Sequence, residues 1–236
     1  MTDRATPAHR HPPTWLLHGG RPLSRWLIRR RYEVREHGTA HVPPQGPVIV
    51  AANHTGVIDG PLLAIFGPRP VHALTKEEMF DGRLGPFLRA SGQVELDRYT
   101  TDLRAIRTCL HVLEHGGAVG IFPEGNRGAG DLVRFRNGAA YLALVTGAPI
   151  VPLMMFGTRP AGGGKNAMPQ PGGVLDLVYG APFRVQRRPW PRTCRLVADT
   201  SAALHARMLE DLAAGLALTG QTLPGPIPAD EAKDIS

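Results

Sequence analysis

Short apolar runs alternate with stretches of helical periodicity along most of this sequence, and this alternation restricts the fold more than any other feature. The apolar runs are residues 48–52, 71–74, 94–96, 118–122, 150–154 and 174–179. Apolar residues at helical spacing are found at 101–115, 137–146 and 193–218. Strands that alternate with helices are typical of an α/β domain with a mostly parallel central sheet flanked by helices. In such folds the polar residues at the ends of strands commonly form the functional site.

The length and composition favour one folded domain. A chain of 236 residues, 42% of them hydrophobic, can bury a full core and a water-excluding pocket. We expect the domain at residues 32–218, preceded by an N-terminal tail and helix at 1–31. Residues 219–236 hold three prolines among small and charged residues, which predicts a flexible C-terminal tail. The glycine-rich stretch 161–173 is expected to be a flexible surface loop or, as an alternative, a lid over the substrate.

Basic residues outnumber acidic ones, which limits the class of partner. The chain has 27 lysines and arginines against 20 acidic residues, and only Lys76, Lys165 and Lys233 are lysines. Because arginine forms paired hydrogen bonds with phosphate, this composition favours anionic lipid, nucleic acid or a phosphorylated cofactor. Charge alone does not choose among them. Cys109 and Cys194 are too few for a disulfide framework and match no zinc or redox motif, so a reducing cytoplasm is the simplest setting.

The segment at residues 15–31 mixes apolar and basic side chains. A helix that opens at Pro22 would carry three apolar residues on one face and two arginines on another, namely Leu23, Trp26 and Leu27 against Arg25 and Arg29. This composition suits an amphipathic helix at the interface of an anionic membrane. Equally, the apolar face could pack into the core and leave the basic face in solvent. The periodicity alone does not decide between these two interpretations.

No targeting or membrane-spanning segment is evident. The first residues are polar and charged, unlike a secretory signal, and no run reaches the roughly 18 apolar residues that span a bilayer. We therefore expect a protein that lies at the cytoplasmic face of a membrane as a peripheral protein, without a transmembrane helix.

A histidine and an aspartate follow the first apolar run, in the sequence Asn53-His54-Thr55-Gly56-Val57-Ile58-Asp59. A neutral imidazole beside a carboxylate is the usual means of taking a proton from a hydroxyl near neutral pH, because the carboxylate fixes the tautomer and stabilises the imidazolium. Such a spacing also occurs by chance. Here the preceding strand and the adjacent Gly56 favour side chains that turn into one cleft. No activated serine or cysteine is evident nearby, so the hydroxyl is expected to be the substrate's own.

Basic residues follow two other runs. Asp97-Arg98 ends one of them, and Arg98 is a candidate for bidentate binding of a phosphate. The alternative is an acidic and basic pair that only finishes the strand. Lys76 is a second candidate phosphate ligand, or else a solvated residue at the start of a helix.

A carboxylate follows a fourth run. Glu124 lies between Pro123, which fixes the backbone, and Gly125, which permits a tight turn, and Arg127 comes shortly after. The turn would present the Glu124 carboxylate at a defined position, suited to a substrate hydroxyl or a neighbouring arginine.

These clusters, in this order and spacing, resemble the motifs of the glycerolipid acyltransferase family, typified by bacterial 1-acylglycerol-3-phosphate O-acyltransferases. The resemblance runs from about residue 46 to residue 153. It rests on Asn-His and Asp at 53–59, glycine and Asp-Arg at 92–98, Phe-Pro-Glu-Gly at 122–125, and an apolar segment with a central proline at 151–152. Three residues depart from those common in the family: Gly56 replaces serine, Asn126 replaces threonine and Gly128 replaces serine.

The resemblance implies a fold like that of glycerol-3-phosphate acyltransferase and a role for each motif. It implies that His54 is the general base, that Asp59 orients it, and that Arg98 binds the phosphate of the acceptor. It also implicates Glu124 and Gly125 in acceptor binding. The expected substrate-binding set is therefore Asn53, Lys76, Arg98, Glu124, Gly125 and Arg127. No metal site is expected, because His111 and His115 lack the glutamate and the third ligand of a zinc motif.

The implied activity is transfer of a fatty acyl group from acyl-CoA or acyl carrier protein to the free hydroxyl of lysophosphatidic acid, which gives phosphatidic acid. Because a thiol is a good leaving group, neither a metal nor a cofactor is expected beyond this co-substrate. An alternative keeps the chemistry and changes the acceptor to another lysophospholipid or to a metabolite with a hydroxyl or amine. A second alternative is a basic, non-catalytic protein that binds membrane or nucleic acid. No nucleic-acid partner is expected, because no helix-turn-helix, RNA-binding strand or zinc finger is recognisable.

Overall fold

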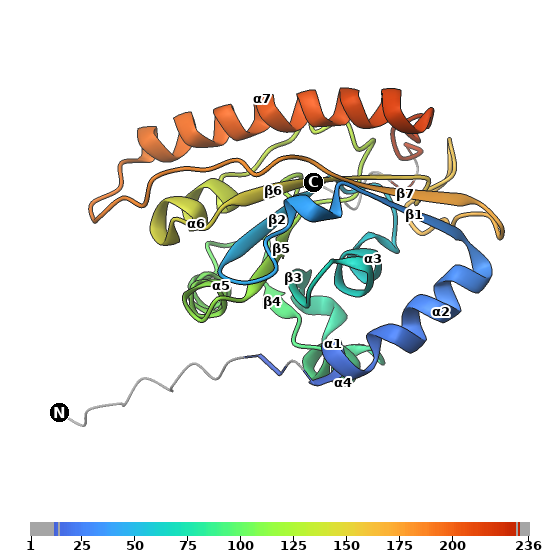
Figure 1. Cartoon of the computed structure of the whole chain (residues 1–236), viewed down its shortest axis with the longest axis horizontal. Coiled ribbons are helices and arrows are strands. Elements are labelled where there is room, and N and C mark those ends of the chain that lie inside the picture. Colours follow the sequence, from blue (N-terminus) through green and yellow to red (C-terminus); the bar gives the residue numbers. More distant parts are fainter. Residues whose placement is uncertain (1–11, 14, 230, 232–236) are drawn as a thin grey trace.

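A computed structural model describes residues 12, 13, 15–229 and 231. The polar tail at residues 1–11 and the last part of the predicted C-terminal tail, 232–236, lie outside the described residues. Within the described part, the chain folds into an α/β domain in which helices flank a central sheet, as the alternation of runs predicts (Figure 1).

The sheet has seven strands in the order β1-β7-β6-β2-β5-β3-β4. Their bounds are β1 (Glu33–His37), β2 (Val48–Ala52), β3 (Val71–Lys76), β4 (Val94–Leu96), β5 (Ala118–Ile121), β6 (Ile150–Phe156) and β7 (Val174–Tyr179). All strands from β2 to β6 run parallel, whereas β7 pairs antiparallel with β6 and parallel with β1. The prediction of a mostly parallel sheet is confirmed, and each predicted apolar run is a strand. Only β1 lies outside those runs.

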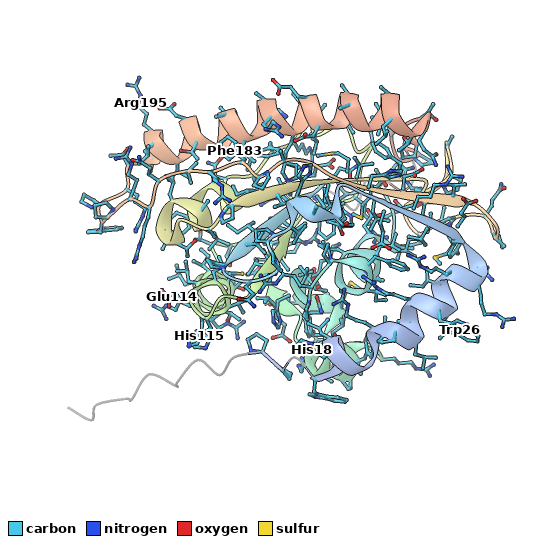
Figure 2. All side chains as sticks on the ribbon, viewed as in Figure 1. His18, Trp26, Glu114, His115, Phe183 and Arg195 are labelled. Carbon is cyan, nitrogen blue, oxygen red and sulfur yellow. The ribbon has the colours of Figure 1, made fainter. Side chains whose placement is uncertain are left out.

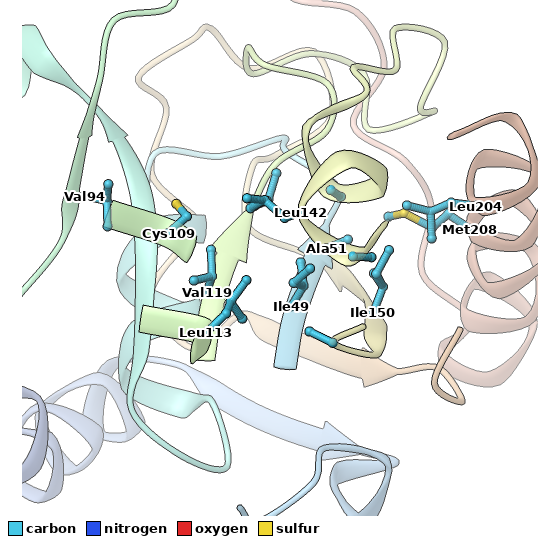
Figure 3. Packing of buried hydrophobic residues seen from close by; sticks show 14 of the residues in the cluster. Ile49, Ala51, Val94, Cys109, Leu113, Val119, Leu142, Ile150, Leu204 and Met208 are labelled. Carbon is cyan, nitrogen blue, oxygen red and sulfur yellow. The ribbon is translucent and has the colours of Figure 1, made fainter. Parts of the chain in front are cut away.

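Helices cover both faces of the sheet, which is why the central strands are apolar along their whole length. Every residue of β2, β5 and β6 is buried. One face packs against α5 (Leu103–Glu114), α6 (Gly138–Thr146) and α7 (Cys194–Thr219), and Figure 3 shows Leu113, Leu142 and Leu204 of these helices in that layer. The other face packs against α3 (Asp59–Phe66). The short elements η1 (Thr39–His41), η2 (Glu77–Met79) and α4 (Gly85–Ala90) connect the strands.

Two helices precede β1, namely α1 (Trp15–Gly19) and α2 (Arg21–Arg31). On α2, Arg21 and Arg25 donate hydrogen bonds to the carbonyl oxygen of Ile65, at 3.1 and 2.8 Å. This carbonyl lies at the end of α3, where the unpaired carbonyl groups and the negative end of the helix dipole attract guanidinium groups. The basic face of α2 therefore packs on the domain.

The exposed surface of the N-terminal helices carries large apolar side chains beside Arg29, Arg30 and Arg31. Four large side chains are 53–66% exposed there, namely Trp15, Leu23, Trp26 and Leu27, and Figure 2 shows Trp26 on the outer side of α2. The alternative of an apolar face packed into the core and a basic face in solvent is therefore wrong. Among the described residues, no helix combines the length and the apolar character needed to cross a bilayer.

The glycine-rich stretch and the C-terminal segment, both expected to be flexible, contact each other. The N–H of Gly162 donates to the carbonyl oxygen of Pro224 at 3.0 Å, and the N–H of Lys165 donates to Oε2 of Glu231 at 2.6 Å. Ile227 is 9% exposed, so the segment also buries apolar surface against the domain. In its described residues, 219–229 and 231, the expected tail instead lies along the domain as a strap over the glycine-rich stretch.

Candidate active site

Polar residues converge at one edge of the sheet because the parallel strands all end there. β2 leads into Asn53 and His54, β3 ends at Lys76, and β4, β5 and β6 lead into Arg98, Glu124 and Arg159. The residues expected from four separate parts of the sequence are therefore brought to the same edge by the topology.

The His54 and Asp59 side chains form a hydrogen-bonded pair. Nδ1 of His54 lies 2.8 Å from Oδ2 of Asp59, whose side chain is fully buried, while the His54 side chain is 20% exposed. The same carboxylate oxygen accepts the backbone N–H groups of Thr55 and Gly56, at 2.7 and 2.8 Å. An ionised carboxylate only accepts hydrogen bonds, so His54 carries its proton on Nδ1. Nε2 then holds a lone pair, as a general base requires.

The loop around His54 is held on three further sides. Oε1 of Glu124 accepts the backbone N–H of His54 at 2.8 Å, and the N–H of Gly128 donates to the carbonyl oxygen of His54 at 2.9 Å. The imidazole ring stacks on Phe122, with the ring centroids 4.1 Å apart. The Phe-Pro-Glu-Gly motif therefore supports the loop of His54 directly.

Glu124 is a buried carboxyl group whose hydrogen-bond partner differs from those that the sequence suggested. Its partner is the His54 backbone, rather than an arginine side chain. Burial raises the pKa of Glu124 to about 8, with the carboxylates of Asp131 and Asp59 adding to the rise and the His54 N–H opposing it. Near neutral pH the Glu124 side chain is thus largely protonated, and it can donate as well as accept a hydrogen bond.

Asn53, one of the predicted substrate-binding residues, is buried and bonds to strand β6. It is 1% exposed; its Nδ2 donates to the carbonyl oxygen of Met155 at 3.1 Å, and its Oδ1 accepts the N–H of Met155 at 2.7 Å. Both ends of the amide thus join the loop after β2 to β6. The hydroxyls of Thr55 and Thr158 also bond across this junction, at 2.7 Å.

Gly56, one of the departures from the family pattern, has a steric cause. A Cβ atom at this position would lie 2.3 Å from the carbonyl oxygen of Thr158, which no side chain tolerates without a shift of the backbone. The close approach of the loop after β6 therefore accounts for glycine here.

Basic side chains gather near the ends of β3 and β4. The pKa of Lys76 is lowered by burial and by the charges of Arg98, Lys165 and Arg127. Burial and the charge of Arg98 also lower the pKa of Arg127. Cations that lower one another's pKa values in this way are stabilised by an anion bound between them.

Arg98 reaches the turn that carries Glu124. Its Nη1 donates to Oδ1 of Asn126 and, at 3.4 Å, to the carbonyl oxygen of Gly125. The alternative in which Arg98 and Asp97 only finish the strand does not describe this arrangement. Asp97 bonds locally with the turn of Tyr99. Nε of Arg98 is buried and has no hydrogen-bond partner within the described part of the chain, so this guanidinium keeps a free donor. Gly125 has φ of +73°, which explains glycine at this turn.

A cavity of about 720 Å³ opens beside Lys76, Arg127 and Lys165. Its lining consists of Lys76, Arg127, Gly164, Lys165, Asn166, Ala167 and Glu231. Nη1 of Arg127 donates to the carbonyl oxygen of Lys165 at 2.7 Å, so the glycine-rich stretch forms one wall of this cationic pocket. The Cα atoms of Glu124 and Arg127 are at most about 11 Å apart, because Arg127 is three positions after Glu124, so the pocket begins close to the His54 loop.

Two residues of this region were absent from the sequence expectations. Lys165 lies in the glycine-rich stretch and lines the pocket, and Arg159 is 3% exposed beside the catalytic loop. The signal for Arg159 was its place just after the apolar run at β6, the same strand-end position that singled out the other residues. Among the described residues, no three His, Cys, Asp or Glu side chains are grouped as metal ligands.

Comparisons with known proteins agree with this geometry. The chain is 29% identical over 187 residues to the 1-acyl-sn-glycerol-3-phosphate acyltransferase of Bacillus subtilis, covering 78% of this chain and 90% of that one. It is 33% identical over 139 residues to the sheep 1-acyl-sn-glycerol-3-phosphate acyltransferase alpha, covering 56% of this chain but only 47% of the sheep protein.

A solved structure supports the same fold. The crystal structure of the 1-acyl-sn-glycerophosphate (LPA) acyltransferase PlsC from Thermotoga maritima superimposes with a TM-score of 0.63 at 24% identity, covering 84% of this chain and 78% of that one. The family model named Acyltransferase matches residues 33–156, just over half of the chain, and this span contains the His54 and Asp59 pair, Arg98 and Glu124. The chain belongs to the acyltransferase family.

Proposed function

We propose that this protein transfers a fatty acyl group from an acyl thioester to the free hydroxyl of lysophosphatidic acid and so produces phosphatidic acid. The observation that carries the proposal is the presence, at one sheet edge, of a histidine and aspartate pair and a cationic pocket. The pair suits a hydroxyl and the pocket suits a phosphate, and lysophosphatidic acid has both groups. The names of the Bacillus subtilis and sheep relatives support the same acceptor.

In the proposed reaction, Nε2 of His54 takes the proton of the acceptor hydroxyl while that oxygen attacks the thioester carbonyl carbon. Asp59 stabilises the imidazolium that forms. The tetrahedral intermediate collapses, the carbon–sulfur bond breaks, and the thiolate leaves and takes the proton from His54. The thiolate is a good leaving group, so this sequence of steps uses no cofactor besides the acyl thioester, which is either acyl-CoA or acyl carrier protein.

The acceptor phosphate is proposed to bind in the cationic pocket. Lys76, Arg127 and Lys165 line it, and the Arg98 guanidinium lies near enough for its charge to act on Lys76 and Arg127. Charge-assisted hydrogen bonds of this kind fix the position of the glycerol backbone, which brings the hydroxyl to a defined distance from the base. Another phosphorylated lysolipid would satisfy the same contacts, whereas an acceptor without phosphate would not.

The test is an acyl-transfer assay with purified protein. Lysophosphatidic acid, lysophosphatidylcholine, lysophosphatidylglycerol and monoacylglycerol are each incubated with acyl-CoA and with acyl carrier protein loaded with the same chain, and the products are identified by mass spectrometry. We expect phosphatidic acid as the main product, abolished in the His54→Ala variant. Preferred acylation of monoacylglycerol would contradict the proposed use of the pocket. No transfer from either donor to any acceptor, with vesicle binding retained, would favour the non-catalytic alternative.

We also propose that the exposed apolar face of α1 and α2 rests on the cytoplasmic surface of a lipid bilayer. Trp26 and Leu27 are each 53% exposed, and the guanidinium of Arg30 lies 4.9 Å from the Trp26 ring centroid. Tryptophan and leucine with a neighbouring arginine suit the boundary between headgroups and acyl chains. Both the acceptor and the product are lipids, so this face would hold the protein where they occur.

Vesicle sedimentation tests the membrane proposal. Wild type and a Trp26→Ser, Leu27→Ser double variant are compared on vesicles with and without 30% anionic lipid, a composition of about physiological surface charge. We expect the double variant to lose most of its binding, and the wild type to bind less at high salt. Equal sedimentation of the two proteins would contradict the assignment of this face. Val133→Ser, at an exposed apolar residue outside α1 and α2, is the matched control.

A further inference from the structure

Arg159 is a buried guanidinium that bonds to backbone carbonyl groups of four different segments. It is 3% exposed. Its Nε donates to Thr55 O at 3.0 Å and its Nη2 to Gly128 O at 2.9 Å. It also donates to Gly163 O, in the glycine-rich stretch, and to Gly225 O, in the C-terminal strap. Among the described residues, it forms no salt bridge with a carboxylate.

Two of these carbonyl groups belong to residues whose backbone N–H groups hold the His54 and Asp59 loop. The N–H of Thr55 donates to Asp59, and the carbonyl of Thr55 accepts from Arg159. Likewise, the N–H of Gly128 donates to the carbonyl of His54, and the carbonyl of Gly128 accepts from Arg159. Arg159 therefore bonds to the carbonyl groups of two residues, Thr55 and Gly128, whose N–H groups bond to Asp59 and to the backbone of His54.

The other two carbonyl groups belong to the segments that wall the pocket. Gly163 precedes the lining residues Gly164 and Lys165, and Gly225 lies in the strap that reaches Glu231. The N–H of Gly162 bonds to Pro224 in the strap, so the two segments are also tied to each other. One side chain thus connects the loop that holds the base with the wall of the pocket that is proposed to hold the acceptor phosphate.

We propose that Arg159 is a positioning residue for acyl transfer, which holds the His54 loop at a fixed distance and orientation relative to the cationic pocket. The proposal rests on the function proposed above and deepens it. A guanidinium suits this role because its planar fork donates in several fixed directions at once, whereas a lysine ammonium at this place cannot reach all four carbonyls with the same geometry. Misplacement of a reacting group by about 1 Å can lower a rate about 100-fold.

The structure offers a matched control in Arg69. This arginine also joins separate segments through carbonyl groups, donating to Pro43, Gly46 and Gly116, but at the opposite edge of the sheet, where the strands begin. Replacement of Arg69 should remove a comparable number of hydrogen bonds and lower the stability of the fold, while the geometry of the candidate active site stays unchanged. Arg69→Ala therefore separates the effect of a lost structural clamp from the effect of a displaced base.

The experiment compares Arg159→Ala, Arg159→Lys, Arg69→Ala and wild type in the acyl-transfer assay, with the folded fraction measured by circular dichroism. For Arg159→Ala we expect kcat per folded enzyme to fall about 100-fold, while KM for lysophosphatidic acid changes much less. Guanidinium chloride at tens of millimolar should restore part of kcat, whereas sodium chloride at the same concentration should not. The kcat of Arg159→Lys should lie between those of wild type and Arg159→Ala, and Arg159→Lys serves as the principal variant if Arg159→Ala is insoluble. Arg69→Ala should keep kcat.

A kcat for both Arg159 variants within threefold of the Arg69→Ala value would overturn the proposal, as would the absence of rescue by guanidinium. A second measurement does not depend on the substrate. The proton between Nδ1 of His54 and Asp59 is observed by NMR as a downfield signal, assigned by its loss in His54→Ala. We expect this signal to shift or broaden in Arg159→Ala and to be unchanged in Arg69→Ala. An unchanged signal in both would overturn the positioning role, even if wild type proved inactive on every lysophospholipid and the proposed function failed.

Discussion

The domain contains two histidine and aspartate pairs of nearly equal length, and only one of them has the surroundings of a catalytic base. His54 lies 2.8 Å from Asp59, and His37 lies 2.9 Å from Asp176. Both aspartates are buried, with side chains 0% and 1% exposed. The distance and the burial alone therefore do not distinguish the two pairs.

The two pairs differ in the ring nitrogen that they leave unused. His54 bonds through Nδ1, so its outer nitrogen Nε2 carries the lone pair, whereas His37 bonds through Nε2 and leaves only Nδ1, which lies next to its own backbone. Asp59 is held by two backbone N–H groups of its own loop, and Asp176 by the amide of Gln221 in the strap, at 3.1 Å.

The pairs also differ in their neighbours. β7 and β6 separate the strand of His37 from β2, and Lys76, Arg98 and Arg127 lie on the other side of β2, after β3, β4 and β5. The His37 pair instead lies where β1 and β7 meet the strap. The free Nε2 and the neighbouring charges therefore favour His54 as the proposed base, while the same contact at His37 holds β1, β7 and the strap together.

The largest difference is expected from removal of the two histidines. His54→Ala should lower kcat by at least about 1,000-fold, because loss of a general base in a comparable arrangement has an effect of this size. His37→Ala should change kcat by less than about threefold. Steady-state acyl transfer, corrected for the folded fraction, measures both. Similar losses in the two variants would remove the distinction drawn between the pairs.

The second largest effect is expected at the cationic pocket, which lies near the His54 pair and away from the His37 pair. Arg98→Ala should raise KM for lysophosphatidic acid by about 10- to 100-fold, because a hydrogen bond to a charged group contributes about 1.5–3 kcal/mol. The same variant should alter KM for monoacylglycerol much less. Arg207→Ala, which removes an arginine on α7 paired with Asp211, is the control. An equal change for both acceptors would show that Arg98 does not bind the phosphate.

The loop of His54 should differ from that of His37 in making the stability depend on pH, because the Glu124 side chain bonds to the backbone of His54. The folded protein has a pKa of about 8 at Glu124, above the ordinary value of 4.5, so the folded state binds the proton more tightly than the unfolded state. This contribution to the free energy of unfolding is present below pH 4.5 and is lost as the pH rises to about 8. In magnitude it amounts to a few kcal/mol.

Glu124→Gln should lack this loss, because glutamine stays neutral over the whole range. Urea unfolding at several pH values between 5 and 8.5 gives the comparison. Glu114→Gln, at an exposed glutamate on α5 (Figure 2), should keep the slope of the wild type. Parallel stability curves for wild type and Glu124→Gln would contradict the raised pKa.

The smallest effect is expected at Asp176, the aspartate of the His37 pair. Asp176→Asn keeps the size of the side chain and weakens the bonds to His37 and Gln221, so we expect a loss of about 1–2 kcal/mol in stability with little change in kcat. Limited proteolysis should cut the strap between residues 219 and 229 faster than in wild type. A large fall in kcat with an intact strap would mean that the His37 pair also serves the reaction.

Most strands could be predicted because burial makes their residues apolar, whichever strands they pair with. β2, β5 and β6 are covered on both faces, so each appears in the sequence as a continuous apolar run. β1 could not be found in this way. It is an edge strand with four polar residues out of five, and only its pairing with β7 makes it a strand. The strap was predicted as a flexible tail from its prolines, while its contacts are with residues far away in the chain.

The sequence by itself determined the geometry of the loop at residues 54–59. Asp59 accepts N–H groups from Thr55 and Gly56 and pairs with His54, all within six residues, so the spacing of the motif already contains the geometry. Only the tertiary structure decided what surrounds that loop. Arg159 bonds both to this loop and to the strap, and Lys165 lines the pocket nearby, because parallel strands end at one edge. Contacts between residues tens of positions apart leave no periodic signal in the sequence.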